Sequence, residues 1–371
     1  MKIAIDALGI SQPGGGRTAT LNQLQALLRL DQENEYWIML DQEEPSLVAP
    51  RVRQIVAGKR GRLASRLWAQ RVLPGLLRRE RIDLVHSMKN LGVFFVPCHS
   101  VVTVYDLSVL LYPEIYPWSD RVYWRWIEPL TLRRADRVIA ISQDTANDLE
   151  RYYRLERGRV EVIYPGYDES YRPLPAEQVA AIRSKYGLPD QFVLHVGSIS
   201  RKKNLLPVVR AMALLRQRGQ DVRLVLVGRL YGKARDDELL RNLESGELAS
   251  QVTWLGAVPA EDLPALYNAA TVLAFPSLQE GFGLVPLEAM ACGLSVITSG
   301  AGAIGEVVSG AARLVEAASD SKAWAQTLQE VLQDPGERQA LREAGLIRAQ
   351  QFSNEAAALR LLAVYHEVMA R

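Results

Sequence analysis

The sequence predicts an α/β protein made of two Rossmann-like, doubly wound domains that face each other across a cleft. Short, almost wholly apolar strands alternate with longer helical stretches, as they do where helices cover both faces of a parallel sheet. The chain has 371 residues, which is long enough for two such domains. A segment rich in proline and glycine, residues 164–175, separates halves of similar size.

Each half is expected to contain about five strands, because short apolar runs are bounded by polar or turn residues. In the first half these runs are residues 2–6, 36–40, 84–87, 101–105 and 137–141. In the second half they are residues 192–196, 222–227, 252–255, 272–275 and 295–298. Helical patterns lie between them, among others at residues 18–30, 145–154, 205–218 and 283–292. Ligands of such sheets bind beyond the carboxyl ends of the strands.

Composition excludes several classes of protein. Lys and Arg number 44 against 42 Asp and Glu, so the net charge of +2 is too small for a protein that coats nucleic acid. The cysteines, Cys98 and Cys292, have no disulfide-framework or metal-ligand spacing. No signal-peptide pattern and no apolar run of about 18 residues is present. We therefore expect a cytoplasmic protein.

Residues 51–81 carry ten of the basic side chains and one acid, Glu80, interleaved with leucines and Trp68. A basic helix with an apolar face is attracted to anionic lipid, so the protein is a candidate for contact with the inner face of a membrane. The alternative is a solvated basic helix that attracts a phosphorylated acceptor.

The segment of residues 280–288 is the most informative part of the chain. It follows the strand at residues 272–275 and opens a helix, whose free N-terminal amides would attract an anion. Glu288, further along this helix, is placed to bind the two hydroxyls of a ribose, and Glu280 precedes the helix. The residues expected to approach a ligand here are Gly281, Phe282, Gly283 and Leu284.

The cations Arg201, Lys202 and Lys203 follow the first strand of the second half and directly precede a helix. Cations beside helix amides form a phosphate site, whereas a solvated charge run is the alternative interpretation. Their position after this strand favours the phosphate site.

In the first half, Gly15, Gly16 and Arg17 belong to a glycine-rich loop that follows the first strand, and Thr18 is expected to cap the next helix. Such a loop either contacts a ligand or is a flexible turn.

Asp106 follows Tyr105 at the end of a strand, so it either projects toward the cleft or caps a turn. His86 is expected to line the cleft, His99 to lie in a loop, and His195 to be a core histidine with its hydrogen bonds satisfied.

Together these residues resemble the retaining GT-B glycosyltransferases of family four, also described as glycosyl transferase group 1. Glu280 and Glu288 match the E-x7-E motif of that family, and the surrounding EGFGL-x-PLEAMACG is close to its usual form. Residues 105–108, together with Pro113 and Glu114, resemble the branch with many bacterial mannosyltransferases. Other segments similar to the family are residues 135–142, 162–168, 196–205, 255–258 and 275–277.

The resemblance implies an N-terminal acceptor-side domain of residues 1–170 and a nucleotide-sugar-binding domain of residues 176–352. A helix within residues 353–371 would cross back to the first domain. The catalytic residues would be Glu280, Lys203 and Asp106. The donor would be bound by Ser198, Arg201, Lys202, Lys203, Val258, Glu280, Gly281, Phe282, Gly283, Leu284 and Glu288. The loop that approaches the acceptor and the diphosphate would be formed by Gly15, Gly16 and Arg17, with Tyr105.

The implied reaction transfers a hexose with retention from a nucleotide-diphosphate sugar to a glycan, lipid-linked or small-molecule acceptor. It would need no obligatory metal, and no nucleic acid partner is expected. GDP-mannose is the first expectation for the donor and UDP-glucose the second. The alternatives are a GT-B sugar-nucleotide epimerase, a phosphorylase-like enzyme that would need a pyridoxal lysine, and a non-catalytic sugar-nucleotide binder.

The chain departs from the family at two positions. Ser198 stands where the family often has an arginine, a charge that Arg201 or Lys202 could supply. Tyr105 stands where the family has the histidine that contacts the sugar 6-hydroxyl.

Overall fold

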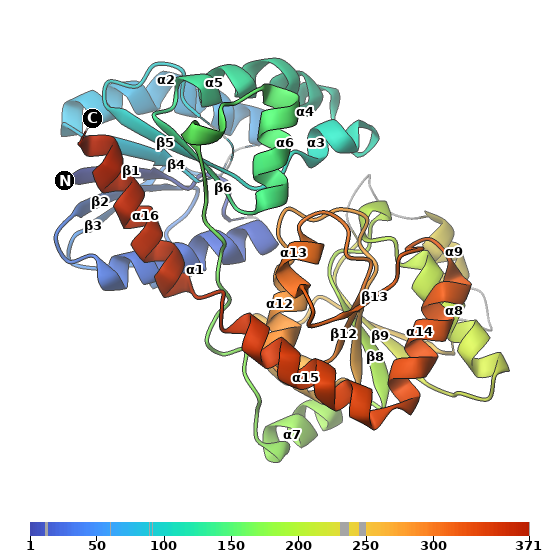
Figure 1. Ribbon diagram of the computed structural model, residues 1–371. Coiled ribbons are helices and arrows are strands. Elements are labelled where there is room, and N and C mark those ends of the chain that lie inside the picture. Colours follow the sequence, from blue (N-terminus) through green and yellow to red (C-terminus); the bar gives the residue numbers. More distant parts are fainter. Residues whose placement is uncertain are drawn as a thin grey trace. The chain divides into compact units, whose positions relative to one another are not determined.

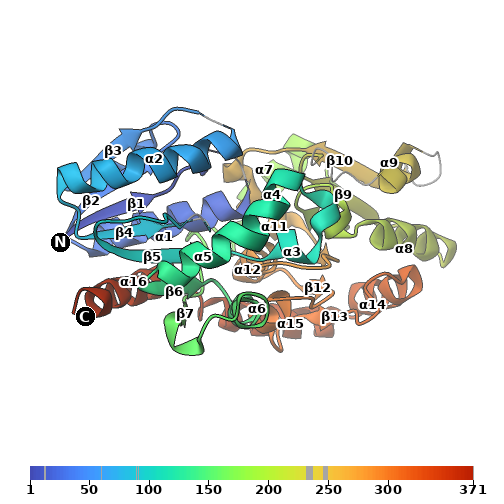
Figure 2. The same cartoon turned by 90° about the horizontal axis from the view of Figure 1, so that it is seen from above.

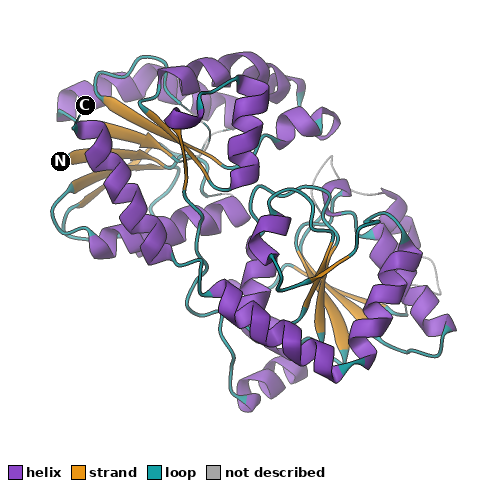
Figure 3. Cartoon of the chain, viewed as in Figure 1, coloured by secondary structure: helices purple, strands orange, loops and turns teal. Residues whose placement is uncertain are grey.

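The computed structural model describes residues 1–11, 14–59, 61–88, 90, 92–230, 237–244 and 250–370. The chain divides into two units, shown in Figure 1. The first comprises Met1–Tyr167 with Phe352–Arg371, and the second comprises Asp168–Gln351. In each unit a parallel sheet lies between helices, as Figure 3 shows. None of the helices in the described ranges is long and apolar enough to cross a lipid bilayer.

The first unit contains a parallel sheet that has seven strands in its described part, in the order β3-β2-β1-β4-β5-β6-β7. The strands are β1 (Lys2–Asp6), β2 (Glu35–Leu40), β3 (Val52–Val56), β4 (Leu84–Ser87), β5 (His99–Val104), β6 (Arg137–Ala140) and β7 (Val160–Val162). The helices are α1 (Gly15–Leu30), α2 (Arg62–Glu80), α3 (Ser108–Leu111), α4 (Trp118–Val122), α5 (Glu128–Arg134), α6 (Gln143–Tyr153) and α16 (Asn354–Met369), with a π-helical turn η3 (Tyr123–Ile127) after α4. The strand order reverses between β1 and β4. The topological switch point of this sheet therefore lies at the carboxyl ends of these two strands.

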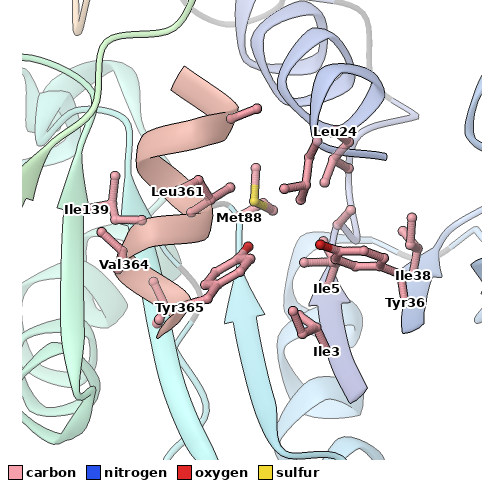
Figure 4. Close-up of a cluster of buried hydrophobic side chains, with 14 of the residues drawn as sticks. Ile3, Ile5, Leu24, Tyr36, Ile38, Met88, Ile139, Leu361, Val364 and Tyr365 are labelled. Atoms are coloured by element: carbon pink, nitrogen blue, oxygen red, sulfur yellow. The ribbon is translucent and has the colours of Figure 1, made fainter. Parts of the chain in front are cut away.

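The pleat of β1 distributes its side chains to both faces of this sheet. Ile3 and Ile5 point to one face, where they join a buried cluster with α1 and with Leu361 of α16 (Figure 4). Ala4 points to the other face and packs with Leu73 of α2, which covers that face (Figure 2). Burial on both faces explains why these strands are nearly all apolar.

The last helix belongs structurally to the first unit. α16 packs against α1, and its Tyr365 hydroxyl lies 2.6 Å from Nδ1 of His86. Nε2 of His86 lies 2.8 Å from the hydroxyl of Thr103, and the imidazole is fully buried. The expectation that His86 lines a cleft is therefore wrong, because this ring ties α16 to the sheet.

The second unit contains a parallel sheet with six strands in its described part, in the order β10-β9-β8-β11-β12-β13. The strands are β8 (Phe192–Val196), β9 (Arg223–Val227), β10 (Val252–Gly256), β11 (Val272–Phe275), β12 (Val296–Thr298) and β13 (Arg313–Leu314). The helices are α7 (Ala176–Tyr186), α8 (Leu206–Gln217), α9 (Asp237–Glu244), α11 (Leu263–Ala269), α12 (Leu284–Ala291), α13 (Ile304–Val308), α14 (Ser321–Gln333) and α15 (Pro335–Ala349). α8 and α14 pack together on one face around the fully buried Trp324, and α12 packs against α15. Here the switch point lies between β8 and β11.

Three strands were missed by the sequence pattern: β3, β7 and β13. All of them are edge strands, and their side chains are half-buried or exposed, so they lack the apolar run of a central strand. Residues 51–81 accordingly hold β3 and α2 rather than one helix. His99 lies in β5 and not in a loop.

The start of α1 also differs from the expectation. Gly14 is its N-cap, so Gly15, Gly16 and Arg17 form the first helical turn and Thr18 is not the cap. The Gly14 φ of 148° is a conformation that a residue with a Cβ rarely adopts, which explains why the helix begins there.

Candidate functional site

The side chains of Lys203 and Glu280 form an ion pair at the carboxyl edge of the second unit's sheet. Nζ of Lys203 lies 2.5 Å from Oε1 of Glu280, and the two side chains are 15% and 17% exposed. Lys203 ends a short 3-10 turn, η5 (Arg201–Lys203), after β8, whereas Glu280 lies in the loop after β11. Adjacent parallel strands thus deliver these residues to the same edge.

Further hydrogen bonds hold these two loops together. The amide of Leu278 donates to the carbonyl of Lys202 at 2.9 Å. The side chain of Asn204 donates to the carbonyl of Pro276 at 3.3 Å. The hydroxyl of Ser277 donates to Oε1 of Glu280 at 2.5 Å. Glu280 is therefore held by its neighbours before any ligand arrives.

These contacts decide the ionisation of Glu280. Burial alone would raise the pKa of its carboxyl, but the charges of Lys203 and Lys202 and hydrogen bonds from Lys203 and Ser277 outweigh burial, so the pKa is lowered. Glu280 is thus an anion beside the Lys203 cation.

Close backbone approach shapes the loop after β8. A Cβ on Gly228 would lie 1.8 Å from the carbonyl oxygen of Gly197, and the φ of Gly228 is 145°. Glycine is therefore required at residue 228 for the turn that carries Ser198. The side chain of Lys203 crosses this turn, because a Cβ on Gly197 would lie 3.4 Å from its Cε.

Glu288 lies in α12 between two phenols. The hydroxyl of Tyr267 donates to its Oε2 at 2.9 Å, and Tyr171 hydrogen-bonds the same carboxyl. Burial raises the pKa of Glu288 to about 7, and the two phenolic hydrogen bonds only partly oppose this rise. Local patterns could not have revealed this pairing, because Tyr171 is distant in sequence and Tyr267 belongs to another helix.

The other donor-side residues predicted from the sequence occupy the same edge of the second unit. Gly283 is the N-cap of α12 with a φ of 111°, and Leu284 opens the helix. Val258 follows β10 and is half-buried, and Arg201 is exposed. The Phe282 ring is buried, so only its backbone could face a ligand. Gly281 is buried beside it.

In the first unit the end of β5 meets the start of α1. The hydroxyl of Thr20 donates to the carbonyl of Gly16 at 2.8 Å and lies 2.7 Å from the hydroxyl of Tyr105. Burial raises the pKa of Tyr105 to about 12, although the bond to Thr20 opposes this rise, so the phenol stays protonated. Gly16 and Tyr105, predicted to act together, are thus linked through the hydroxyl of Thr20.

Arg17 is held inside the first unit. Its guanidinium donates to the carbonyl of Ile10 at 2.8 Å and pairs with Oε2 of Glu44 at 2.6 Å. A phosphate that binds Arg17 would have to compete with the carboxylate of Glu44.

Asp106 accepts hydrogen bonds from the amide and the hydroxyl of Ser108, at 3.0 and 2.5 Å. These bonds hold Asp106 in the turn before α3, whose N-cap is Leu107.

Comparison with known proteins matches a glycosyltransferase family to each half of the chain. Residues 179–348 match the family described as glycosyl transferases group 1, and residues 13–171 match glycosyltransferase family 4. The chain is 32% identical to O-antigen chain mannosyltransferase B of Escherichia coli over 75% of this chain and 72% of that protein. It is 35% identical to D-inositol 3-phosphate glycosyltransferase of Salinispora arenicola over 66% of this chain and 57% of that protein.

The match to the serotype-specific mannosyltransferase WbdA of Escherichia coli, 33% identical over 57% of this chain, spans only 27% of that longer protein. Among solved structures, sucrose-phosphate synthase from Thermosynechococcus elongatus has a TM-score of 0.81 at 24% identity, covering 100% of this chain and 99% of that one. Anabaena HepE in complex with UDP and glucose has a TM-score of 0.79 at 20% identity, covering 99% and 100%. These likenesses concern the fold.

Two Rossmann-like units of this topology define the GT-B class of glycosyltransferases. The chain belongs to glycosyltransferase family 4, with the group 1 domain in its second half, and is an enzyme that acts on nucleotide sugars.

Proposed function

We propose that this enzyme transfers a hexose, with retention, from a nucleotide-diphosphate sugar to a glycan or lipid-linked acceptor. GDP-mannose is the proposed donor, because curated relatives at about one third identity are named mannosyltransferases, and UDP-glucose is the main alternative. The observation that carries the proposal is the Lys203–Glu280 pair at the carboxyl edge of the sheet.

The charges of this pair suit the reaction. Transfer from a nucleotide diphosphate builds negative charge on the departing phosphate and positive charge on the anomeric carbon. We propose that Lys203, with Arg201 and Lys202, binds the diphosphate and stabilises the leaving charge, and that Glu280 accepts hydrogen bonds from the sugar hydroxyls. The amides of residues 281–284 at the start of α12 add donors for the anion.

We propose that Glu288 binds the ribose and that the backbone near Val258 reads the base. The first unit would bind the acceptor through the first turn of α1, Tyr105 and Asp106. Retention would follow from attack on the face that the phosphate leaves, with the phosphate accepting the acceptor's proton, so no carboxylate nucleophile is needed.

The first experiment is a thermal-shift panel with GDP, UDP, ADP and their common sugar conjugates. A ligand at about 100 times its dissociation constant stabilises the folded state by roughly 2.7 kcal/mol, which is easily detected. Stabilisation by GDP and GDP-mannose alone supports the proposed donor, and stabilisation by uridine nucleotides replaces it with a UDP-sugar. No shift with any of these nucleotides contradicts the proposed donor site.

Product analysis then separates the alternatives. NMR of the product with an acceptor reports whether the anomeric configuration is retained. An isomerised nucleotide sugar formed without acceptor indicates an epimerase, and binding without release of free nucleotide indicates a non-catalytic binder. Equal rates with EDTA and with added Mg²⁺ are expected for metal-independent transfer.

We also propose that residues 51–81 contact anionic lipid. The support is a basic surface in which Leu67 and Val72 of α2 are exposed, although Leu73 and Leu77 are buried in the core. α4 lies beside α2, because Arg66 pairs with Asp120 at 2.8 Å, and Trp118 and Trp126 are exposed in this region. Sedimentation with vesicles tests this: equal binding to neutral and anionic lipid contradicts it.

A further inference from the structure

His195 is a buried residue of β8 with one satisfied and one unsatisfied ring nitrogen. Its Nδ1 lies 3.0 Å from the carbonyl oxygen of Ala274. Since a carbonyl only accepts, Nδ1 carries the proton. Burial lowers the pKa of His195 to about 4, so the ring is neutral near pH 7 and Nε2 presents a lone pair. Nε2 is buried and has no hydrogen-bond partner in the described part of the chain. The expectation of a satisfied core histidine is therefore wrong.

This lone pair borders the space that Lys203 occupies. A Cβ on Gly197 would lie 3.3 Å from Nε2 of His195 and 3.4 Å from Cε of Lys203. The imidazole is stacked on Phe275, with ring centroids 5.9 Å apart and planes 16° apart. The ammonium of Lys203 lies 4.9 Å from the centroid of the same phenyl ring. Lys203 and His195 therefore both lie beside the ring of Phe275.

The imidazole cannot easily turn away from Lys203. The bond from Nδ1 to Ala274 fixes its orientation, and the stack on Phe275 fixes its plane. An unsatisfied buried acceptor destabilises the folded state, so an acceptor kept in this state beside a cation requires an explanation. The Lys203 ammonium has three donors on a flexible stem, and one of them bonds Glu280.

We propose that His195 is a positioning residue for Lys203. When hydroxyls of the donor sugar donate hydrogen bonds to Glu280, they replace the bond from Lys203. The ammonium of Lys203 then donates to Nε2 of His195, and this bond holds the ammonium against the donor diphosphate. The inference rests on the proposed function, in which Lys203 binds the diphosphate. Nε2 would thus replace the acceptor that Glu280 supplies in the absence of donor.

The test compares binding of a nucleoside diphosphate with that of its monophosphate by calorimetry, using GDP with GMP or UDP with UMP, whichever base the protein binds. The ratio of the two affinities reports on groups that contact the second phosphate. His195→Asn keeps an amide donor near the place of Nδ1 but lacks an acceptor near Nε2. The longer side chain of His195→Gln places its amide near the position of Nε2 and so restores an acceptor there.

We expect His195→Asn to lower the preference for the diphosphate roughly tenfold, with monophosphate affinity unchanged, and His195→Gln to recover it. Lys203→Ala should by itself lower the preference for the diphosphate over the monophosphate. Adding His195→Asn to Lys203→Ala should not lower this preference further. Monophosphate affinity and the thermal midpoint report whether each variant is folded.

The outcomes separate two failures. If Lys203→Ala lowers the diphosphate preference but His195→Asn leaves it unchanged, or if the two effects simply add, the positioning role is wrong and the proposed function stands. If Lys203→Ala leaves the preference unchanged, the phosphate role of Lys203 and the inference fall together.

Discussion

The hydroxyl of Tyr267 in α11 donates a 2.9 Å hydrogen bond to the carboxyl of Glu288 in α12, a residue that is only 6% exposed. The pKa of this carboxyl is raised to about 7 by burial, although its phenolic partners favour the anion. The residue proposed to bind ribose therefore titrates near neutral pH, and this affects both stability and binding.

Glu288→Gln should change how stability depends on pH. The folded state favours the protonated carboxyl, so this contribution is complete below the ordinary pKa of 4.5 and is lost as pH rises through about 7. The glutamine side chain would stay neutral throughout. We expect the unfolding free energy of the variant to rise relative to wild type by up to about 3 kcal/mol between pH 4.5 and 8, measured by urea denaturation. The exposed Glu343→Gln provides the control, and a pH-independent difference for Glu288→Gln would contradict the prediction.

Glu288→Ala should remove discrimination between ribose and deoxyribose. A carboxylate that binds the ribose hydroxyls makes a nucleoside diphosphate bind more tightly than its 2′-deoxy form, by roughly tenfold for one charge-assisted hydrogen bond. The wild-type preference should grow as pH rises through about 7, because the anion is the better acceptor. Calorimetry with both nucleotides measures this. A variant that keeps the wild-type preference would exclude the ribose role.

Gly228→Ala should displace the turn that carries Ser198. The new Cβ would meet the Gly197 carbonyl at 1.8 Å, so the loop must shift. We expect at least a tenfold loss of nucleoside diphosphate affinity, about 1.4 kcal/mol. Gly219→Ala is the matched control: its φ is also positive, at 79°, but no atom lies within 4 Å of the added Cβ. It should cost about 1 kcal/mol of stability through backbone strain and leave affinity unchanged. Equal affinities for the two variants would contradict the close approach.

Tyr365→Phe should weaken the attachment of α16 to the first unit. The change leaves Nδ1 of the fully buried His86 without its partner at 2.6 Å, which costs about 1–3 kcal/mol in unfolding free energy. Chemical denaturation measures the loss. Tyr152→Phe, on an exposed part of α6, is the control and should change stability by less than about 0.5 kcal/mol. A similar, small effect for both variants would show that the buried bond contributes little.

Much of the fold could be predicted from local pattern. Central strands such as β1 and β8 are continuous apolar runs, because both faces of a parallel sheet are covered. The edge strands β3, β7 and β13 could not be predicted in this way, since an edge strand half-exposed to solvent needs no such run. The sequence pattern predicts that α1 starts at Thr18, because nothing local shows that Gly14 adopts a positive φ.

The sequence by itself determined the class of this protein: alternating strands and helices, and Glu280 and Glu288 at a motif spacing beside a run of cations. Tertiary structure alone decided how those residues are used. It paired Lys203 with Glu280, 77 positions apart, surrounded Glu288 with phenols, and left Nε2 of His195 unsatisfied beside Lys203. The physical reason is that spacing along the chain specifies which face or edge a side chain occupies. Its partner, burial and pKa depend on which distant strands and helices the crossovers bring to that edge.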